Sequence, residues 1–310
     1  MESRTIGSLS VSLVGLGCNN FGRRIDAGQT ERVVSAALDH GVTLFDTADV
    51  YGGDGRSEEL LGQALASRRD EAVVATKFGM KLDEQRRGAH PDYVRRACED
   101  SLRRLGTDRI DLYQLHAPDP EVPIAETLGA LDELVQAGKV REIGNSNFSG
   151  EQLDEAEQAA DDGGTSRFVV AQNHWSVLSR EAEQDVVPAA VRNGLRVLPY
   201  FPLASGLLTG KYRPGQDPDP SWRIAQMPEE RREKLLREER LEKVAALEQV
   251  AGANDRSLLE LAFSWLAAQP VVASVIAGAT RPEQVTANVD AVGWQLDEDA
   301  LAAVDEITGP

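Results

Sequence analysis

The sequence predicts an α/β protein that folds as a (β/α)8 barrel. Short apolar runs alternate with amphipathic helical segments from residue 13 almost to the end of the chain. There are eight such runs, and eight parallel strands that are each followed by a helix close most simply into a barrel. The length of 310 residues suits this architecture, so we expect one domain over residues 1–310.

The eight apolar runs are short and are bounded by turn residues, as strands are. They lie at 13–17, 42–46, 71–77, 110–116, 140–146, 167–172, 195–200 and 273–277. An open doubly wound sheet is the competing architecture. It is less favoured because the first strand–helix turn, GLGCNNFGRR, lacks the G-x-G-x-x-G fingerprint of that fold.

The segments between the strands carry the end signals of helices. Thr30 stands at a plausible N-cap position before the run ERVVSAALDH. Pro91 opens the segment DYVRRACEDSLRRL at a first-turn position, and Gly106 closes it where a left-handed residue is common. These signals predict helices between the strands.

Two segments lie outside the alternation. Residues 3–12 form two short runs around Gly7 and Ser8, and we expect a β-hairpin that closes the bottom of the barrel. Residues 213–238 are rich in proline and then densely charged, so this long loop is either a lid over a site or a solvated excursion. Because it follows the seventh strand, and barrel active sites lie at the carboxyl ends of the strands, we expect a lid that becomes ordered when a ligand binds there.

The charge balance excludes several kinds of partner. The chain has 33 Lys plus Arg against 51 Asp plus Glu, a formal net charge of -18, which repels nucleic acid and anionic membrane surfaces. No apolar run is long enough for a membrane span and the N-terminus lacks a secretory signal, so we expect a cytoplasmic protein. Cys18 and Cys98 are predicted to be reduced, and the four histidines show no metal-ligand spacing.

Polar residues stand where the predicted strands end, from the second strand to the seventh. Barrel active sites are built at these carboxyl ends, although a polar residue at any single strand end would be ordinary. Their coincidence on consecutive strands indicates a site. The residues are Asp46, Lys77, His116, Ser146, Asn147, Gln172 and Tyr200.

Some of these residues suit proton donation. Lys77 ends an apolar strand, and Asp46 on the neighbouring strand can supply its counter-charge; a purely structural ion pair is the alternative. Tyr51 lies in the glycine-rich loop after Asp46, and an adjacent ammonium group is expected to lower the pKa of its phenol. With His116 on the same side, the arrangement suits protonation of a developing alkoxide.

The last predicted strand runs into a helix start in the segment SVIAGATRPEQVTAN. Thr280 and Glu283 have the spacing of a capping box, with Pro282 in the first turn. The charge of Arg281 opposes the helix dipole, which favours a negative ligand at this end. A phosphate would meet free N–H groups and the guanidinium here; a solvated surface arginine is the alternative.

Long motifs, in order along nearly the whole chain, resemble those of the aldo-keto reductase family. They read FDTADVYGGDGRSEELLG, VATKFG, SLRRLGTDRIDLYQLHAPDP, LDELVQAGKVREIGNSNFS, PYFPLASGLLTGKY and IAGATRPEQVTAN. The resemblance implies a (β/α)8 barrel that binds an extended nicotinamide dinucleotide across its carboxyl face. It also implies that Tyr51 is the general acid in carbonyl reduction. Lys77, held by Asp46, would lower the pKa of that tyrosine, and His116 would orient the carbonyl group.

The resemblance further implies a set of cofactor contacts. Ser146, Asn147 and Gln172 would bind the nicotinamide carboxamide, and Tyr200 would stack on the ring. The pyrophosphate would be lined by Leu203, Ser205, Gly206 and Lys211. The adenosine end would be held by Gly278, Ala279, Thr280, Arg281, Gln284 and Asn288.

The chain departs from the family pattern at three places. Ala277 stands where proline is usual, and Asn145 stands where a small apolar residue or cysteine is commoner. Gly278 and Ala279 replace a Lys-Ser pair that many members place on the 2′-phosphate. A preference for NADPH therefore rests mainly on Arg281, and NADH stays possible.

We therefore expect an NADPH-dependent reductase whose substrate is a small aldehyde or ketone. Lys211 and Arg281, with Arg23 and Arg24 as further candidates, would hold the dinucleotide on an otherwise acidic protein, and Trp222 could reach the substrate. Two alternatives stay open: a cofactor-sensing regulatory subunit of the potassium-channel β-subunit type, and a lysine-dependent aldolase or isomerase on the same barrel. The sequence indicates neither the substrate's identity nor the oligomeric state.

Overall fold

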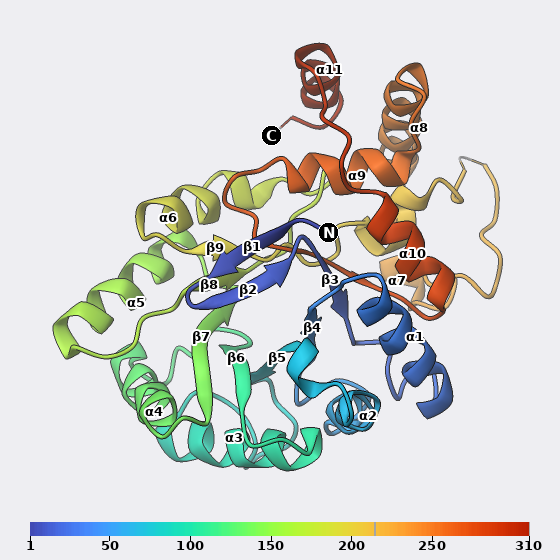
Figure 1. Cartoon of the computed structure of the whole chain (residues 1–310). Coiled ribbons are helices and arrows are strands. Elements are labelled where there is room, and N and C mark those ends of the chain that lie inside the picture. The colour runs from blue at the N-terminus through green and yellow to red at the C-terminus, as the bar shows by residue number, and fades with distance from the viewer. Residues whose placement is uncertain (214, 310) are drawn as a thin grey trace.

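The computed structural model describes residues 1–213 and 215–309; Pro214, which falls in the predicted long loop, and Pro310 lie outside the described residues. Within the described residues, eight parallel strands form one sheet in the spatial order β10, β3, β4, β5, β6, β7, β8, β9 (Figure 1). The strands are β3 (Val14–Gly17), β4 (Leu44–Asp46), β5 (Val73–Phe78), β6 (Ile110–Leu115), β7 (Val140–Ser146), β8 (Val170–Gln172), β9 (Arg196–Val197) and β10 (Val275–Gly278).

Backbone pairing between the two outer members closes this sheet into a barrel. Val197 of β9 pairs in parallel with Val272, and Tyr200 pairs with Ile276 of β10. The predicted (β/α)8 barrel is thus confirmed, and each predicted strand overlaps an observed one, although β9 is much shorter than predicted. Because the strands are parallel, all their carboxyl ends lie on one face of the barrel.

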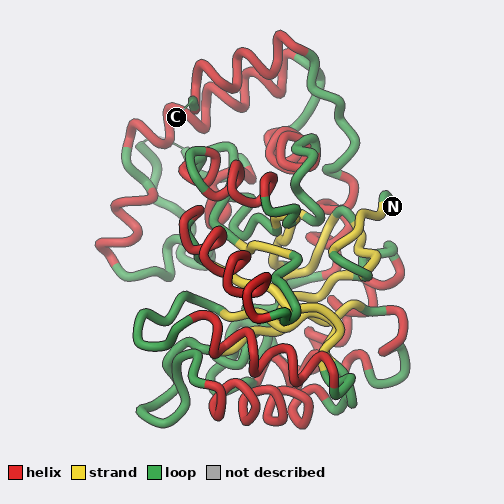
Figure 2. Tube along the Cα trace, turned by 90° about the vertical axis from the view of Figure 1, so that its left-hand side faces the viewer, coloured by secondary structure: helices red, strands yellow, loops and turns green. Residues whose placement is uncertain are grey.

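Helices surround the strands on the outside (Figure 2). Those that follow the barrel strands are α1 (Ala27–Asp39), α2 (Arg56–Leu65), α3 (Pro91–Leu105), α4 (Ile124–Gln136), α5 (Gly150–Gly163), α6 (Val186–Arg192), α9 (Leu258–Ala267) and α10 (Pro282–Asp290). The others are α7 (Glu229–Leu235), α8 (Glu238–Ala253), α11 (Glu298–Thr308) and short 3-10 helices at Arg69–Glu71, Glu181–Glu183 and Ala204–Thr209. No helix within the described ranges is both long and apolar enough to cross a membrane.

The predicted ends of α3 are confirmed, whereas the predicted start of α1 is wrong. Pro91 is at the first position of α3, and Gly106 caps that helix with a left-handed φ of 63°. The predicted N-cap at Thr30 is wrong, because α1 begins at Ala27 and is capped by Asp26. Asp26 and Gln29 form a capping box, which satisfies the first-turn N–H groups one turn before Thr30.

The predicted hairpin is confirmed as β1 (Ser3–Ile6) paired antiparallel with β2 (Leu9–Ser12). It lies across the open middle of the barrel in Figure 1. The side chains of Ile6, Leu9 and Val11 are buried against the apolar residues of the barrel interior. The hairpin therefore closes the amino end and leaves the carboxyl end as the accessible face.

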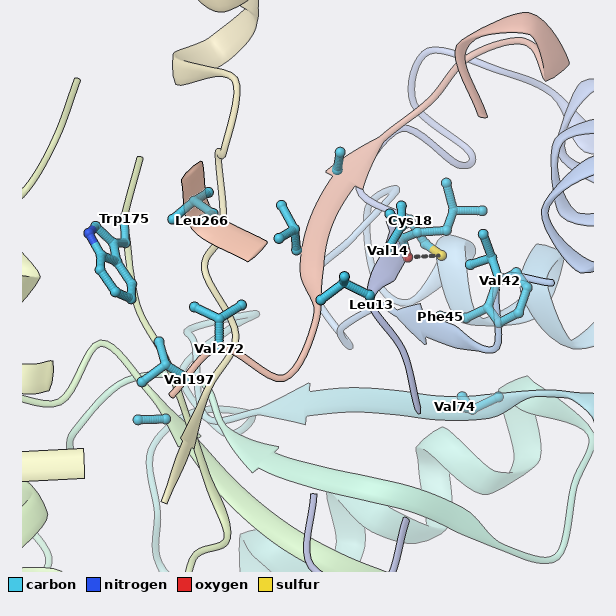
Figure 3. Packing of buried hydrophobic residues seen from close by; sticks show 14 of the residues in the cluster. Leu13, Val14, Cys18, Val42, Phe45, Val74, Trp175, Val197, Leu266 and Val272 are labelled. Carbon is cyan, nitrogen blue, oxygen red and sulfur yellow. Dashed lines mark hydrogen bonds between the residues drawn. The ribbon is translucent and has the colours of Figure 1, made fainter. Parts of the chain in front are cut away.

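A continuous apolar layer joins the barrel to its helices. Figure 3 shows Val14 with Val42 in one part of this layer, and Val197 with Val272 where the barrel closes. Burying each such aliphatic side chain contributes about 1.5–3 kcal/mol. The free thiol of Cys18 lies in the same layer. The strand ends are thereby fixed relative to one another.

Candidate active site

A cavity of about 790 Å³ lies at the carboxyl ends of the barrel strands. All but two of the predicted catalytic and cofactor-contact residues line it, as does the further candidate Arg24, whereas Arg23 does not. Lys77 is fully buried beneath the wall, and Ala279 is buried without lining the cavity. The predicted residues on the wall are Asp46, Tyr51, His116, Ser146, Asn147, Gln172, Tyr200, Leu203, Ser205, Gly206, Lys211, Gly278, Thr280, Arg281, Gln284 and Asn288.

A second, shallower hollow of about 910 Å³ opens among residues that precede strands β5, β6 and β7, at the opposite end of the barrel. Its arginines are already paired. Arg69 Nη2 lies 2.7 Å from Asp111 Oδ2, and Arg109 Nη2 lies 2.5 Å from Asp70 Oδ1. Since its charges are satisfied by neighbours and barrel chemistry resides at the carboxyl face, we assign the site to the first cavity.

An ion pair forms the floor of the cavity. Lys77 Nζ donates to both carboxylate oxygens of Asp46 at 2.7 Å and to the Thr47 carbonyl at 2.9 Å. The amides of Gln172 and Gln114 also donate to Asp46 Oδ1, at 2.9 and 3.4 Å. Burial by itself would lower the pKa of Lys77, but the charge of Asp46 raises it above its ordinary value. The ammonium is therefore both charged and immobile.

Tyr51 lies over this ion pair. Lys77 Nζ is 5.2 Å from the centroid of the phenol ring, and the His116 ring meets it edge-on at 5.8 Å. The loop reaches this position through Gly52, whose φ is 75° and where a Cβ would lie 2.7 Å from the Phe21 carbonyl oxygen. The structure thus brings together the four residues predicted as a catalytic group.

The predicted lowering of the Tyr51 pKa is wrong. Burial raises the pKa of Tyr51 above its ordinary value, and the opposing effect of the Lys77 ammonium is the smaller of the two. Burial, aided by Lys77, lowers the pKa of His116 to about 3. At neutral pH the phenol therefore keeps its proton and the imidazole is uncharged.

The predicted carboxamide contacts are bonded to one another across the strand ends. Asn147, with a positive φ of 63°, donates from Nδ2 to the His116 carbonyl at 2.9 Å and accepts the Tyr200 hydroxyl at 2.7 Å. Ser146 Oγ donates to the Gln172 carbonyl at 2.8 Å. Gln172 Nε2 is bonded to Asp46, whereas the amide Oε1 of the same side chain has no hydrogen-bond partner in the described part of the chain. That oxygen can accept a hydrogen bond from a ligand.

The turn that follows β9 is conformationally strained. Phe201, Ala204 and Ser205 have φ values of 54°, 46° and 63°, in a region that non-glycine residues rarely adopt. Each such residue costs of order 1–3 kcal/mol, and such strain gathers at functional sites. Tyr200, directly before this turn, stacks on His174 with ring centroids 5.5 Å apart. The strained backbone and the stacked ring together shape one wall of the cavity.

Four cations, Arg24, Lys211, Arg223 and Arg281, line the cavity, and we call them the cationic rim. In the described ranges, the first three make no ion pair, and Arg281 Nε approaches Glu283 only to 4.0 Å. Burial lowers the pKa of Lys211, and Arg24 and Arg281 add to that effect. Burial and neighbouring arginines also lower the pKa of Arg223. Uncompensated like charges fit a polyanionic ligand such as the phosphates of a dinucleotide.

The predicted capping box at the start of α10 is wrong. Arg281 is the N-cap residue, and it makes no side-chain capping hydrogen bond. The N–H and hydroxyl of Thr280 instead donate to Gln284 Oε1, at 2.7 and 3.1 Å. The first turn of α10 is consequently uncapped where Arg281 lines the cavity, which suits an anion.

The loop 213–238 contributes directly to the cavity. Trp222 and Arg223 line it, and the fully buried Ile224 anchors the segment, its N–H donating to the Tyr212 hydroxyl at 3.3 Å. Helix α7, later in the same loop, buries none of its residues. This position fits a lid, whose ordering on ligand binding stays a prediction.

Several wall residues were not found by sequence reasoning. Asn19 and Asn20 follow the first barrel strand, and the rule that polar residues at strand ends form the site would have found them. Met80, Phe201 and Arg223 also line the cavity. Phe201 lies within the motif PYFPLASGLLTGKY, which could have indicated it. Met80 and Arg223 reach the wall only through the folding of their loops.

Comparison with known proteins identifies the family. Residues 13–308 match the model of the Aldo/keto reductase family. The aldo-keto reductase YhdN of Bacillus subtilis is 36% identical, over 96% of this chain and 91% of its own length. The uncharacterized oxidoreductase YrpG of the same species is 35% identical, over 99% and 96%. A probable voltage-gated potassium channel subunit beta of Arabidopsis thaliana is 33% identical, over 94% and 91%. The chain therefore belongs to the aldo/keto reductase family, whose members are oxidoreductases that use nicotinamide cofactors.

Proposed function

We propose that this protein reduces a small aldehyde or ketone to the alcohol in an NADPH-dependent reaction, with Tyr51 as the proton donor. One observation carries the proposal. A protonated phenol lies over a fixed Lys77–Asp46 pair in a cavity that is also lined by four cations. The cavity thus combines a proton source with a place for a polyanionic cofactor.

The residues present fit a nicotinamide dinucleotide. The cationic rim and the uncapped start of α10 would hold its phosphates, and the free Oε1 of Gln172 would accept from its carboxamide. Bound there, the reduced nicotinamide would supply a hydride to the carbonyl carbon. The preference for NADPH over NADH rests on Arg281, which is largely exposed and free to reach an added phosphate.

The protein's own part in the reaction is proton transfer and charge stabilisation. Tyr51 gives its proton to the carbonyl oxygen as negative charge develops there. The Lys77 ammonium, which Asp46 holds in place, then stabilises the resulting phenolate. His116 is neutral, so it orients the carbonyl group without adding a competing charge.

Tyr51→Phe tests this function. With a panel of aldehydes and ketones and with NADPH and NADH in parallel, we expect wild-type turnover and a loss of at least about 100-fold in the variant. Cofactor affinity, measured by fluorescence titration, should be unchanged. Tyr113→Phe is the matched control, because it removes a buried hydroxyl that does not line the cavity. Full turnover in Tyr51→Phe would remove Tyr51 from the proposed role.

The match to a probable potassium channel subunit beta supports a second candidate, a cofactor-sensing regulatory subunit. It predicts tight NADPH binding without turnover of any carbonyl compound in the same panel. A Schiff-base aldolase or isomerase receives no support, because the Lys77 amine is fully buried, charged and bonded to three oxygen atoms.

A further inference from the structure

A second cluster of buried ionisable groups lies behind the Tyr51 loop, outside the cavity. Asp49, 1% exposed, comes from that loop, and Glu58, fully buried, comes from the first turn of α2. Arg104 Nε donates to Glu58 Oε2 at 2.6 Å, and the Thr76 hydroxyl donates to Glu58 Oε1 at 2.5 Å. The Tyr93 hydroxyl donates to Asp49 Oδ2 at 3.4 Å. Strand β5 and helices α2 and α3 enclose the cluster.

The cluster holds two carboxyl groups and one guanidinium. Arg104 pairs with Glu58 and makes no ion pair with Asp49 in the described part of the chain. Asp49 Oδ1 is buried with no hydrogen-bond partner. An unpaired carboxylate in such a place is costly, so the charge count favours a protonated Asp49. Burial and the charge of Glu58 raise the pKa of Asp49 to about 7, against the smaller effects of Arg104 and Tyr93.

Asp49 is tied to the proposed active site through the backbone. Its N–H donates to the Lys77 carbonyl at 3.1 Å, so it anchors the loop to the strand that carries the ammonium group. Tyr51 follows two residues later, and its N–H donates to the Ala48 carbonyl at 3.1 Å. A shift of the backbone at Asp49 therefore moves the segment that places Tyr51.

We propose that Asp49 is a positioning residue for carbonyl reduction, and that its carboxyl proton keeps the loop 47–52 in the arrangement that sets Tyr51 over Lys77. Below neutral pH the neutral carboxyl fits its buried place. As the pH rises through neutrality the carboxylate forms, and the loop must shift or admit water to solvate it. The inference rests on the proposed role of Tyr51.

Glu58 and the other ionisable groups around Asp49 and Glu58 come from three packed elements. Helix α2 contributes Glu58, helix α3 contributes Tyr93, Cys98 and Arg104, and strand β6 contributes Tyr113. Burial raises the pKa of Tyr93, Cys98 and Tyr113 above their ordinary values, so these three stay neutral near pH 7. Glu58 is bonded to Arg104. Asp49 is therefore the group of this cluster that titrates near neutrality.

Hydrogen exchange and kinetics test the inference with wild type, Asp49→Asn and the control Asp54→Asn. Asp54 lies two residues beyond the loop 47–52, is exposed, and has a φ of 52° that asparagine also adopts. In wild type and in the control, we expect protection of the loop amides to fall between about pH 6 and pH 8. The kcat for reduction should fall about tenfold over that interval, as the protonated fraction does, at constant KM for NADPH. Both effects should be absent in Asp49→Asn.

The outcomes separate this inference from the proposed function. Turnover with an unchanged pH profile and loop protection in Asp49→Asn would overturn the role of Asp49 and leave that of Tyr51 intact. If no variant turns over, the proposed function fails, and exchange still decides whether Asp49 controls the loop. Should Asp49→Asn not fold, Glu58→Gln replaces it. Removing the neighbouring charge must move the wild-type transition to lower pH, and an unmoved transition would contradict the inference.

Discussion

Lys77 and Asp46 each depend on the other for a place in the barrel interior. Lys77 is fully buried and Asp46 nearly so, and the carboxylate is bonded to the ammonium through both of its oxygens. A buried charge left alone is far more costly than a neutral pair of similar size. The pair is therefore structural in any case, and stability measurements can separate that role from the chemical one.

Lys77→Met should destabilise the protein by about 3–5 kcal/mol, because it leaves the Asp46 charge buried and unpaired. The double variant Lys77→Met with Asp46→Asn removes both charges and should regain most of that loss. Urea unfolding measures both free energies. Neither variant should reduce carbonyl compounds. Normal turnover in the stable double variant would show that the pair sets strand register and takes no part in the reaction.

The positions of these residues follow from the sequence, whereas their energetics do not. Regular alternation along β5 and the parallel order of the strands suffice to place Lys77 beside Asp46. The pKa of Tyr51 depends on whether burial or the ammonium charge has the larger effect, and burial depends on every loop around the ring. Asp49 was missed for the same reason, since nothing in its local sequence shows that Arg104 is bonded to Glu58.

At the scale of elements, regular strands and helices were predictable and irregular segments were not. Every barrel strand was predicted because its apolar residues need only local alternation and a packed neighbour. The N-cap of α10 lies one residue later than predicted, because the side chain of Gln284 reaches back to Thr280 and replaces the expected capping bond. The loop 213–238 was predicted as a long connection, but its contact through Trp222 and Arg223 depends on tertiary packing.

Proteolysis tests whether the loop 213–238 acts as a lid. It contains exposed basic residues in and around α7, after which trypsin can cleave the chain. Its residues Trp222 and Arg223 line the cavity. Saturating NADPH should slow cleavage within the loop several-fold, because a phosphate bound to Arg223 joins the loop to the barrel. Cleavage after Lys139, which lies at the opposite end of the barrel, is the internal reference. Equal slowing at both places, or none at either, would count against a lid.

For the molecule as a whole, the negative net charge opposes the binding of an anionic dinucleotide. The net charge of -18 repels a dinucleotide at long range, yet the cationic rim presents four positive side chains to the cavity. Ions screen charges beyond about 10 Å at 0.1 M salt. The local rim therefore determines binding, while the overall acidity governs solubility and the rate of approach.

Arg281→Ala distinguishes these two contributions. If Arg281 binds the 2′-phosphate, the variant should lose about tenfold or more in affinity for NADPH, and much less for NADH, because a charge-assisted contact is lost only with the former. Arg103→Ala is the matched control: it changes the net charge equally, but Arg103 is exposed on α3 and pairs with Asp100. Titrations of both cofactors at two salt concentrations measure the effect, and higher salt should narrow the NADPH preference of wild type. If Arg281→Ala loses affinity equally for NADPH and NADH, the 2′-phosphate is bound elsewhere on the rim. If Arg103→Ala loses as much NADPH affinity as Arg281→Ala does, the overall charge governs affinity and the rim does not.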